Sequence, residues 1–216
     1  MKKPIFLFAI LAAFFILIDR SYGQCPTGDL LIETAQDLSD FAQDYPNCTQ
    51  ISGDLIIRGG NSLTHISQLS KIKEVEGSLE LYGNSLLTSI APLGIERLGG
   101  DLIVSRNASL IDLKGLEGLT EIGGNLKYTY NYEHFTSNGL ENVKVVHGNL
   151  NVTVSRNNHL AGIQLDTIHG NASFEISVFL NNLSAMGPLK HLGGRLHIYD
   201  TSITNISPFS ELTSMG

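Results

Sequence analysis

The residues best placed for chemistry in this sequence are two histidines and two aspartates that recur at a fixed interval. His147 and His169 occupy the same position in successive repeats, so one metal ion could reach both. Two imidazoles alone make a poor metal site, because protein zinc sites use three or four protein ligands. We therefore expect a solvent-exposed histidine pair, with neither a bound metal nor a cofactor.

Asp54 and Asp101 would be the candidates for acid–base work, which needs positioned carboxylates. Ser78 holds the intervening copy of their position, so the two carboxylates are not neighbours. Gly-x-Ser-x-Gly, His-Glu-x-x-His and phosphate-binding glycine motifs are missing from the sequence. The sequence therefore predicts a protein without enzymatic activity.

The interval comes from a repeat that is marked by glycine. The repeat glycines are Gly53, Gly77, Gly100, Gly124, Gly148, Gly170 and Gly194, spaced by 22–24 residues. Apolar and polar residues alternate after each glycine, as in Leu79-Glu80-Leu81-Tyr82, which predicts a short strand with one buried face. The glycine itself is expected at a sharp turn or a close approach to the neighbouring coil.

The rest of each copy steps by three residues. Apolar residues at Leu110, Leu113, Leu116 and Leu119 show this spacing most clearly, and Ile203, Ile206, Phe209, Leu212 and Met215 repeat it. An asparagine or aspartate commonly stands three residues before the run: Asn84, Asn107, Asn157 and Asp200. Stacked side chains of this type can satisfy the backbone groups of turns in neighbouring coils.

One coil cannot bury its own apolar face, whereas stacked coils can, at about 4.8 Å per step. The prediction is a mainly β fold, a right-handed β-solenoid of about 24-residue leucine-rich coils with one parallel sheet and an N-terminal disulfide cap. The solenoid is expected to span residues 51–216. Ser214-Met215-Gly216 has the form of a further copy, so we expect the chain to be truncated at its C-terminus.

Residues 1–23 have the features of a secretory signal peptide. Lys2 and Lys3 precede 14 apolar residues, and Ser21-Tyr22-Gly23 supplies small residues for cleavage. The alternative is a membrane anchor, but a bilayer span needs about 20 residues. Removing this segment removes three of the 14 basic and one of the 21 acidic side chains, which leaves a formal charge of −9. A chain this acidic lacks the basic footprint of a nucleic-acid binder, and we also expect no membrane insertion after signal removal.

Cys25 and Cys48 are the two cysteines of the sequence. Export would place them in an oxidising compartment, which favours one disulfide over two free thiols. Closing a loop of this length contributes about 3 kcal/mol. Residues 24–50 are the expected cap, with a short helix over Asp37–Tyr45 whose Leu38 and Phe41 face the first coil.

The Ile-x-Gly-x-Leu-x-Ile motif of Ile51–Ile57 resembles the strand motif of the receptor L domain, as does the preceding Tyr45-Pro46-Asn47-Cys48-Thr49. That domain is the ligand-binding solenoid in the extracellular parts of insulin-receptor-like and epidermal-growth-factor-receptor-like proteins. The style of the repeats is most similar to secreted bacterial leucine-rich-repeat proteins. The resemblance covers residues 25–216 and implies a secreted, extracellular or cell-surface protein whose sheet face meets a ligand.

Side chains that are expected to point outward from the sheet are the candidates for binding. They are Ile56, Arg58, Glu80, Tyr82, Ile103, Lys127, His197 and Tyr199. Aromatic anchors in a polar surround are typical of protein-binding patches. The alternative is that single exposed apolar residues are ordinary on protein surfaces.

Six Asn-x-Ser/Thr motifs are candidate glycosylation sites: Asn47, Asn107, Asn151, Asn171, Asn182 and Asn205. In a eukaryotic secretory pathway several would carry glycans. Asn151 and Asn171 lie on the expected binding face, where a glycan would block it. In a bacterium the six motifs have no such meaning.

The sequence thus favours an extracellular or cell-surface binding or adhesion module that recognises a protein or glycan through its exposed sheet face. The alternative is a structural repeat spacer of a longer surface protein or receptor ectodomain, without a ligand of its own. A repeat motif identifies a fold much better than a function.

Overall fold

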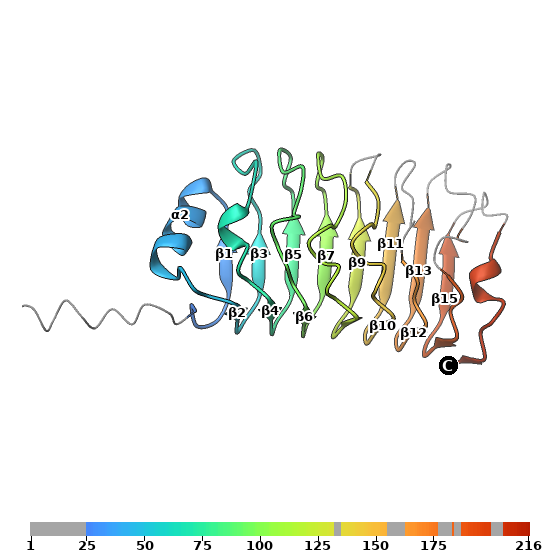
Figure 1. Ribbon diagram of the computed structural model, residues 1–216. Coiled ribbons are helices and arrows are strands. Elements are labelled where there is room, and N and C mark those ends of the chain that lie inside the picture. The colour runs from blue at the N-terminus through green and yellow to red at the C-terminus, as the bar shows by residue number, and fades with distance from the viewer. Residues whose placement is uncertain (1–24, 132–134, 155–162, 177–182, 184–186, 200–204) are drawn as a thin grey trace, which may run out of the picture.

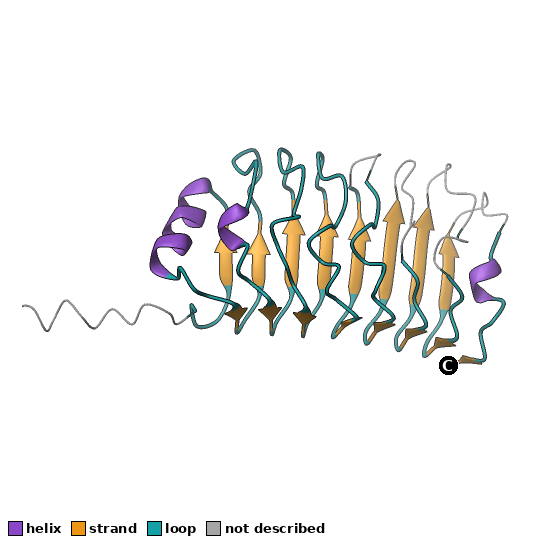
Figure 2. Cartoon of the chain, viewed as in Figure 1, coloured by secondary structure: helices purple, strands orange, loops and turns teal. Residues whose placement is uncertain are grey.

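The computed structural model describes residues 25–131, 135–154, 163–176, 183, 187–199 and 205–216. Successive coils stack side by side into an elongated β-solenoid, with one helix at its N-terminal end (Figure 1). Figure 2 shows strands along two edges of the coils, with loops and the short 3-10 helices η1 (Ser67–Leu69) and η3 (Ser207–Phe209) over the remaining path. The predicted mainly β, parallel solenoid is confirmed.

The widest element is an eight-stranded parallel sheet in which each strand pairs with its equivalent in the next coil. Its strands are β1 (Leu30–Ile32), β3 (Leu55–Ile57), β5 (Leu79–Tyr82), β7 (Leu102–Ser105), β9 (Leu126–Thr129), β11 (Leu150–Val154), β13 (Ala172–Ile176) and β15 (Leu196–Tyr199). The register aligns equivalent residues, so that Leu55 pairs with Leu79 and Leu79 with Leu102. Identical positions of the repeat therefore form columns along the sheet.

Two narrow parallel sheets run along a second edge of the solenoid, where one sheet alone was predicted. One consists of β2 (Gln50–Ile51), β4 (Glu74–Val75) and β6 (Arg97–Leu98), and the other of β8 (Glu121–Ile122), β10 (Val145–Val146), β12 (Thr167–Ile168), β14 (His191–Leu192) and β16 (Ser214–Met215). Their strands have two residues each, because the repeat glycines follow at once. Coil-to-coil backbone bonds continue past them, as from the Gly99 N–H to the Val75 carbonyl.

The core is a stack of aliphatic side chains inside the coils. Leu110, Leu113, Leu116 and Leu119 are all buried, which confirms the three-residue spacing as an inward pattern. In the last coil the pattern holds in part: Phe209 and Leu212 pack against the core, whereas Ile206 is 57% and Met215 62% exposed. Ile203 lies outside the described residues.

A buried asparagine ladder closes the turns that follow the wide-sheet strands. The Asn84 amide donates to the Ile57 carbonyl and to the Asn107 Oδ1, and the Asn107 amide donates to the Leu81 carbonyl and the Asn131 Oδ1. The predicted role of Asn84 and Asn107 is confirmed. Asn131 extends the ladder without having been predicted, and Asn157 and Asp200 lie outside the described residues.

A second ladder runs beside the repeat glycines and explains them. The side-chain oxygen of the residue after a repeat glycine accepts the backbone N–H of the equivalent residue in the next coil. The acceptors are Asp29, Asp54, Ser78, Asp101, Asn125, Asn149 and Asn171, and the Arg195 N–H is the last donor. A Cβ on Gly77 would lie 2.3 Å from the Asp54 Oδ1, and one on Gly124 would lie 2.1 Å from the Asp101 Oδ1. The glycines therefore make room for the ladder.

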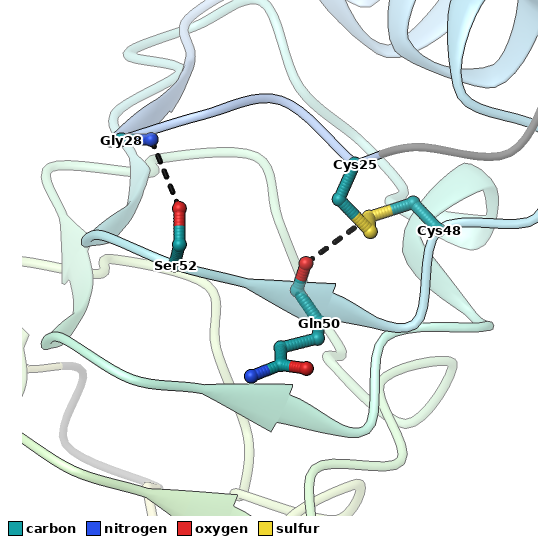
Figure 3. The surroundings of a disulfide bond; sticks show 5 residues. All are labelled: Cys25, Gly28, Cys48, Gln50 and Ser52. Atoms are coloured by element: carbon teal, nitrogen blue, oxygen red, sulfur yellow. Dashed lines mark hydrogen bonds between the residues drawn. A yellow bond between two sulfur atoms is a disulfide. The ribbon is translucent and has the colours of Figure 1, made fainter. Parts of the chain in front are cut away.

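The N-terminal segment forms both the cap and the first strand. Helix α2 (Ala35–Asp44) covers the end of the stack beside β1, and buries Leu38 and Phe41 as predicted. Cys25 and Cys48 form the predicted disulfide, which ties the chain ahead of β1 to the segment that enters β2 (Figure 3). The cap therefore extends the wide sheet by one strand, through the pairing of β1 with β3.

The helix begins with a capping box. The Thr34 hydroxyl accepts the Asp37 N–H, and the Asp37 carboxylate accepts the N–H groups of Glu33 and Thr34. The backbone hydrogen bond from Glu33, followed by those from Thr34, lowers the pKa of Asp37 below its ordinary value. This contribution to stability is therefore present above the ordinary aspartate pKa, and is lost as the pH falls through the folded-state pKa.

Tyr128 on β9 points into the core and places a hydroxyl group there. Among the described residues the buried Tyr128 hydroxyl has no hydrogen-bond partner, and the nearby Asn131 amide donates to the Val104 carbonyl. The ring packs on Phe135, with the two centroids 4.7 Å apart. Burial raises the pKa of Tyr128 well above its ordinary value, so the hydroxyl remains neutral.

Replacing Tyr128 by phenylalanine is expected to leave the free energy of unfolding unchanged or to raise it by about 1 kcal/mol, since it removes an unpaired buried polar group. Urea unfolding would measure the difference. Tyr199→Phe, at a residue that is 63% exposed, is the control with no expected effect. A loss above about 1 kcal/mol in Tyr128→Phe would mean that the hydroxyl makes a bond that stabilises the fold.

Candidate binding surface

The outward face of the wide sheet presents one residue per strand in a central column. The register places Leu31, Ile56, Glu80, Ile103, Lys127, Asn151, Ser173 and His197 in line across all eight strands. These side chains are half-buried or exposed, while their neighbours on the same strands, such as Leu102 and Val104, lie in the core. Leu31, Ile56 and Ile103 are the apolar members of the column, Glu80 stands between the two isoleucines, and the column is polar from Lys127 onward.

A second outward column lies two residues further along the strands. It contains Tyr82, Ser105, Thr129, Thr153, Glu175 and Tyr199, and Arg58 follows β3 directly at the first place. Ser105 and Thr129 are buried, and their hydroxyl oxygens lie 2.8 Å apart in a hydrogen bond. In the middle of this column the two hydroxyl groups therefore bond to each other. The larger side chains lie at its two ends.

Three coils meet around the ring of Tyr82. The guanidinium carbon of Arg58, from the coil before, lies 5.6 Å from the ring centroid, and that of Arg106, from the coil after, lies 5.7 Å away. Both distances are in the range of cation–π contacts. Arg58 also donates to the Glu80 carboxylate at 2.9 Å, and this hydrogen bond raises the pKa of Arg58 further.

Arg106 has a left-handed backbone, with φ of +57°. The glycine Gly83 takes this conformation in the coil before, where its N–H donates to the Ser105 carbonyl. A non-glycine residue in this region costs about 1–2 kcal/mol. The conformation carries Arg106 past the strand end, to where its side chain contacts Tyr82.

The structure divides the predicted site residues into two groups. Ile56, Arg58, Glu80, Tyr82, Ile103 and Lys127 lie together on or directly after four neighbouring strands, β3 to β9. His197 and Tyr199 lie on β15, three strands beyond β9, with their rings stacked at 5.9 Å between centroids. Strands in a sheet are about 4.8 Å apart, so this second pair is about 14 Å from Lys127.

Two further residues lie beside the first group and were not predicted from the sequence. Leu31 is 46% exposed and heads the central column, because residues of the cap form β1. Arg106 contacts Tyr82 from the neighbouring coil. We call Leu31, Ile56, Arg58, Glu80, Tyr82, Ile103, Arg106 and Lys127 the N-terminal patch.

The candidate glycosylation sites differ widely in exposure. Asn47 and Asn171 are exposed, and Asn151 and Asn205 are half-buried. Asn107 is completely buried with its amide in the asparagine ladder, so a glycan at Asn107 is incompatible with the folded chain. Asn182 lies outside the described residues.

The histidine pair lies on the narrow-sheet edge. The rings of His147 and His169 stack at 5.2 Å between centroids, and His191 adds a third ring 5.8 Å from His169. His147 Nε2 lies 3.0 Å from the Glu121 carboxylate. The part of the chain that the structure describes has no group of three or more histidine, cysteine, aspartate or glutamate residues that could hold a metal ion.

A hollow of about 390 Å³ lies next to these histidines and is rich in carboxylates. Glu74 pairs with Arg97, Glu96 with Lys73 and Glu121 with His147. Glu76 accepts a hydrogen bond from the Gln50 amide at 2.6 Å. Each of the four carboxylates is therefore engaged in an ion pair or a hydrogen bond within the protein.

Comparison with known proteins bears on the N-terminal half of the solenoid. Residues 47–95 match the Receptor L domain family. The match begins at the disulfide cap and takes in β2 to β5, and it confirms the predicted resemblance over this stretch. No curated protein and no solved structure gave a match to the chain.

The Receptor L domain is a non-enzymatic, receptor-type domain, and the match indicates an extracellular ligand-binding role. The disulfide agrees with an extracellular or cell-surface location. No helix in the described part of the chain has the length and apolar character that crossing a membrane requires.

Proposed function

We propose that this chain is a secreted or cell-surface binding module that recognises a protein or glycan through the outward face of its wide sheet. The observation that carries the proposal is the N-terminal patch, in which aliphatic, aromatic and arginine side chains meet on neighbouring strands. Aromatic residues and arginine are the types most enriched at the energetic centres of protein interfaces. The patch also overlaps the stretch that matches the Receptor L domain.

The double variant Tyr82→Asp/Ile103→Asp is expected to lose binding to its partners on arrays of extracellular proteins and glycans. The two substitutions remove the aromatic ring and an aliphatic contact from the centre of the patch. The fold should persist, since Arg58 and Arg106 are in place to pair with the new carboxylate at position 82. Circular dichroism and urea unfolding would verify this.

Leu86→Asp/Ile111→Asp is the matched control. Leu86 is 45% and Ile111 54% exposed, and both lie outside the wide sheet, so this variant introduces the same two charges away from the patch. The control is expected to retain the partners of the unmodified chain. If both double variants retained them equally, the sheet face would not be the binding surface. If the unmodified chain retained no ligand, the structural-spacer alternative would be favoured.

A further inference from the structure

We propose that the ligand of the N-terminal patch is an acidic segment of a protein, with carboxylates against Arg106 and Lys127 and apolar side chains against Leu31, Ile56 and Ile103. This inference rests on the proposed function, because it assumes that the sheet face binds. It adds the chemical class of the ligand.

Charge is the first argument. Beyond residues 1–23 the chain has a formal charge of −9, yet two exposed cations, Arg106 and Lys127, lie on neighbouring coils at this face. Within the described residues neither Arg106 nor Lys127 belongs to an ion pair, whereas Arg58 is neutralised by Glu80 and lies in the field of Glu33. Lys127 has the apolar Ile103 and the uncharged Asn151 as its partners in register. Two cations without counter-charges favour a ligand that supplies carboxylates.

The ring of Tyr82 is the second argument, and it favours a protein over a glycan. Sugars bind protein aromatic rings by stacking on the open faces of the ring. Here the guanidinium groups of Arg58 and Arg106 approach the Tyr82 ring from the coils on either side of it. The aliphatic Leu31, Ile56 and Ile103 offer contacts for apolar side chains instead.

The backbone of Arg106 is the third argument. Three equivalent positions of successive coils, Gly83, Arg106 and Tyr130, share this left-handed backbone, and the two non-glycine residues adopt it at a cost in conformational energy. Strained residues of this kind are concentrated at functional sites. The strained backbone places a cation beside the patch, where a ligand carboxylate could pair with it.

The test uses a displayed library of random 12-residue peptides, selected against the unmodified chain and then sequenced. The retained peptides are expected to be enriched in aspartate and glutamate together with leucine or phenylalanine. Their binding should weaken as sodium chloride is raised from 0.05 to 0.5 M, since exposed charge pairs are screened by salt. A retained pool that is neutral or basic, or a library from which nothing is retained, would overturn the inference.

Arg106→Asn/Lys127→Ala is the decisive variant, since asparagine tolerates the left-handed backbone at position 106. It is expected to bind the acidic peptides about tenfold more weakly, which corresponds to about 1.4 kcal/mol. Lys144→Ala/Lys190→Ala removes the same charge beside the narrow sheets and should leave the affinity unchanged. Unchanged affinity in the first variant, or an equal loss in the second, would contradict the assignment.

Oligogalacturonate serves as the competing glycan with the same carboxylate chemistry. It is expected not to displace the acidic peptides, and tighter binding of this sugar than of the peptides would assign the patch to acidic glycans instead.

Failure of the acidic-ligand inference can be told apart from failure of the proposed sheet-face binding. If array partners are lost in Tyr82→Asp/Ile103→Asp but kept in Arg106→Asn/Lys127→Ala, the sheet face remains the binding surface and the acidic ligand is excluded.

Discussion

Replacing Asn107 by alanine is expected to lower the free energy of unfolding by about 3–5 kcal/mol. The Asn107 Oδ1 accepts the backbone N–H and the amide of Asn84, and its own amide donates to the Leu81 carbonyl and the Asn131 Oδ1. Alanine would leave several of these buried groups without partners, and each orphaned group costs about 1–3 kcal/mol. Urea unfolding followed by circular dichroism would measure the loss.

Asn142→Ala is the control for this prediction, because Asn142 is exposed and makes one side-chain bond, to the Glu117 carbonyl. We expect a change below about 0.5 kcal/mol there. Equal effects at positions 107 and 142 would show that the buried ladder contributes no more than a surface bond. The same burial means that a folded chain with a glycan on Asn107 should not be recovered from a eukaryotic secretory pathway.

Replacing Gly124 by alanine is expected to destabilise the solenoid by about 3 kcal/mol. The new Cβ would lie 2.1 Å from the Asp101 Oδ1 and 2.9 Å from the carbonyl carbon of Gly100. The Asp101 Oδ1 accepts the Asn125 N–H at 2.6 Å, so relief of the clash requires that the coils separate or that this bond breaks. Overpacking of this kind costs about 1–3 kcal/mol, and the broken bond adds to it.

Gly60→Asn separates this steric effect from the general effect of losing a glycine. Gly60 has a φ of +53° and no atom within 4 Å of its added Cβ, and asparagine tolerates that backbone. Its effect is expected to remain below about 1 kcal/mol. If Gly124→Ala were as mild as Gly60→Asn, the requirement for glycine would come from the turn and not from the close approach of the coils.

The periodicity predicted the solenoid because stacking repeats a sequence pattern in space. Leucines at every third position and alternating residues after each glycine both carry direct information about which side chains are buried. The parallel register then follows, since equivalent residues of neighbouring coils align. The cap helix was predicted by the same logic, from Leu38 and Phe41 on one face.

The ladder of side-chain oxygens beside the repeat glycines was not predicted, although its signal is present in the sequence. Aspartate, serine or asparagine follows six of the seven repeat glycines, and Gly28-Asp29-Leu30-Leu31-Ile32 is an earlier copy of the same motif inside the cap. Interpreting residues 24–50 only as a cap hid the strand β1 and the exposed Leu31. The acceptor role of Asp54 and Asp101 also explains why they recur without any catalytic purpose.

The N-terminal patch could be predicted only in part. Alternation along the strands gave the outward residues Ile56, Glu80 and Ile103, because it reports on which face a side chain lies. The contact of Arg106 with Tyr82 depends on a left-handed backbone just past the strand end, which Gly83, Arg106 and Tyr130 share, and of these three only the glycine signals that conformation in the sequence. The separation of His197 and Tyr199 from the patch required the order of the strands.

Hydroxyl-radical footprinting of the chain, with and without a ligand retained on the arrays, tests the central claim most directly. Tyr82 and Tyr199 are outward tyrosines at opposite ends of one column of the wide sheet, so they serve as paired reporters. Binding at the N-terminal patch predicts that the ligand lowers oxidation of Tyr82 and leaves Tyr199 unchanged. Protection of Tyr199 alone, or of neither tyrosine, would contradict the assignment of ligand binding to this end of the sheet.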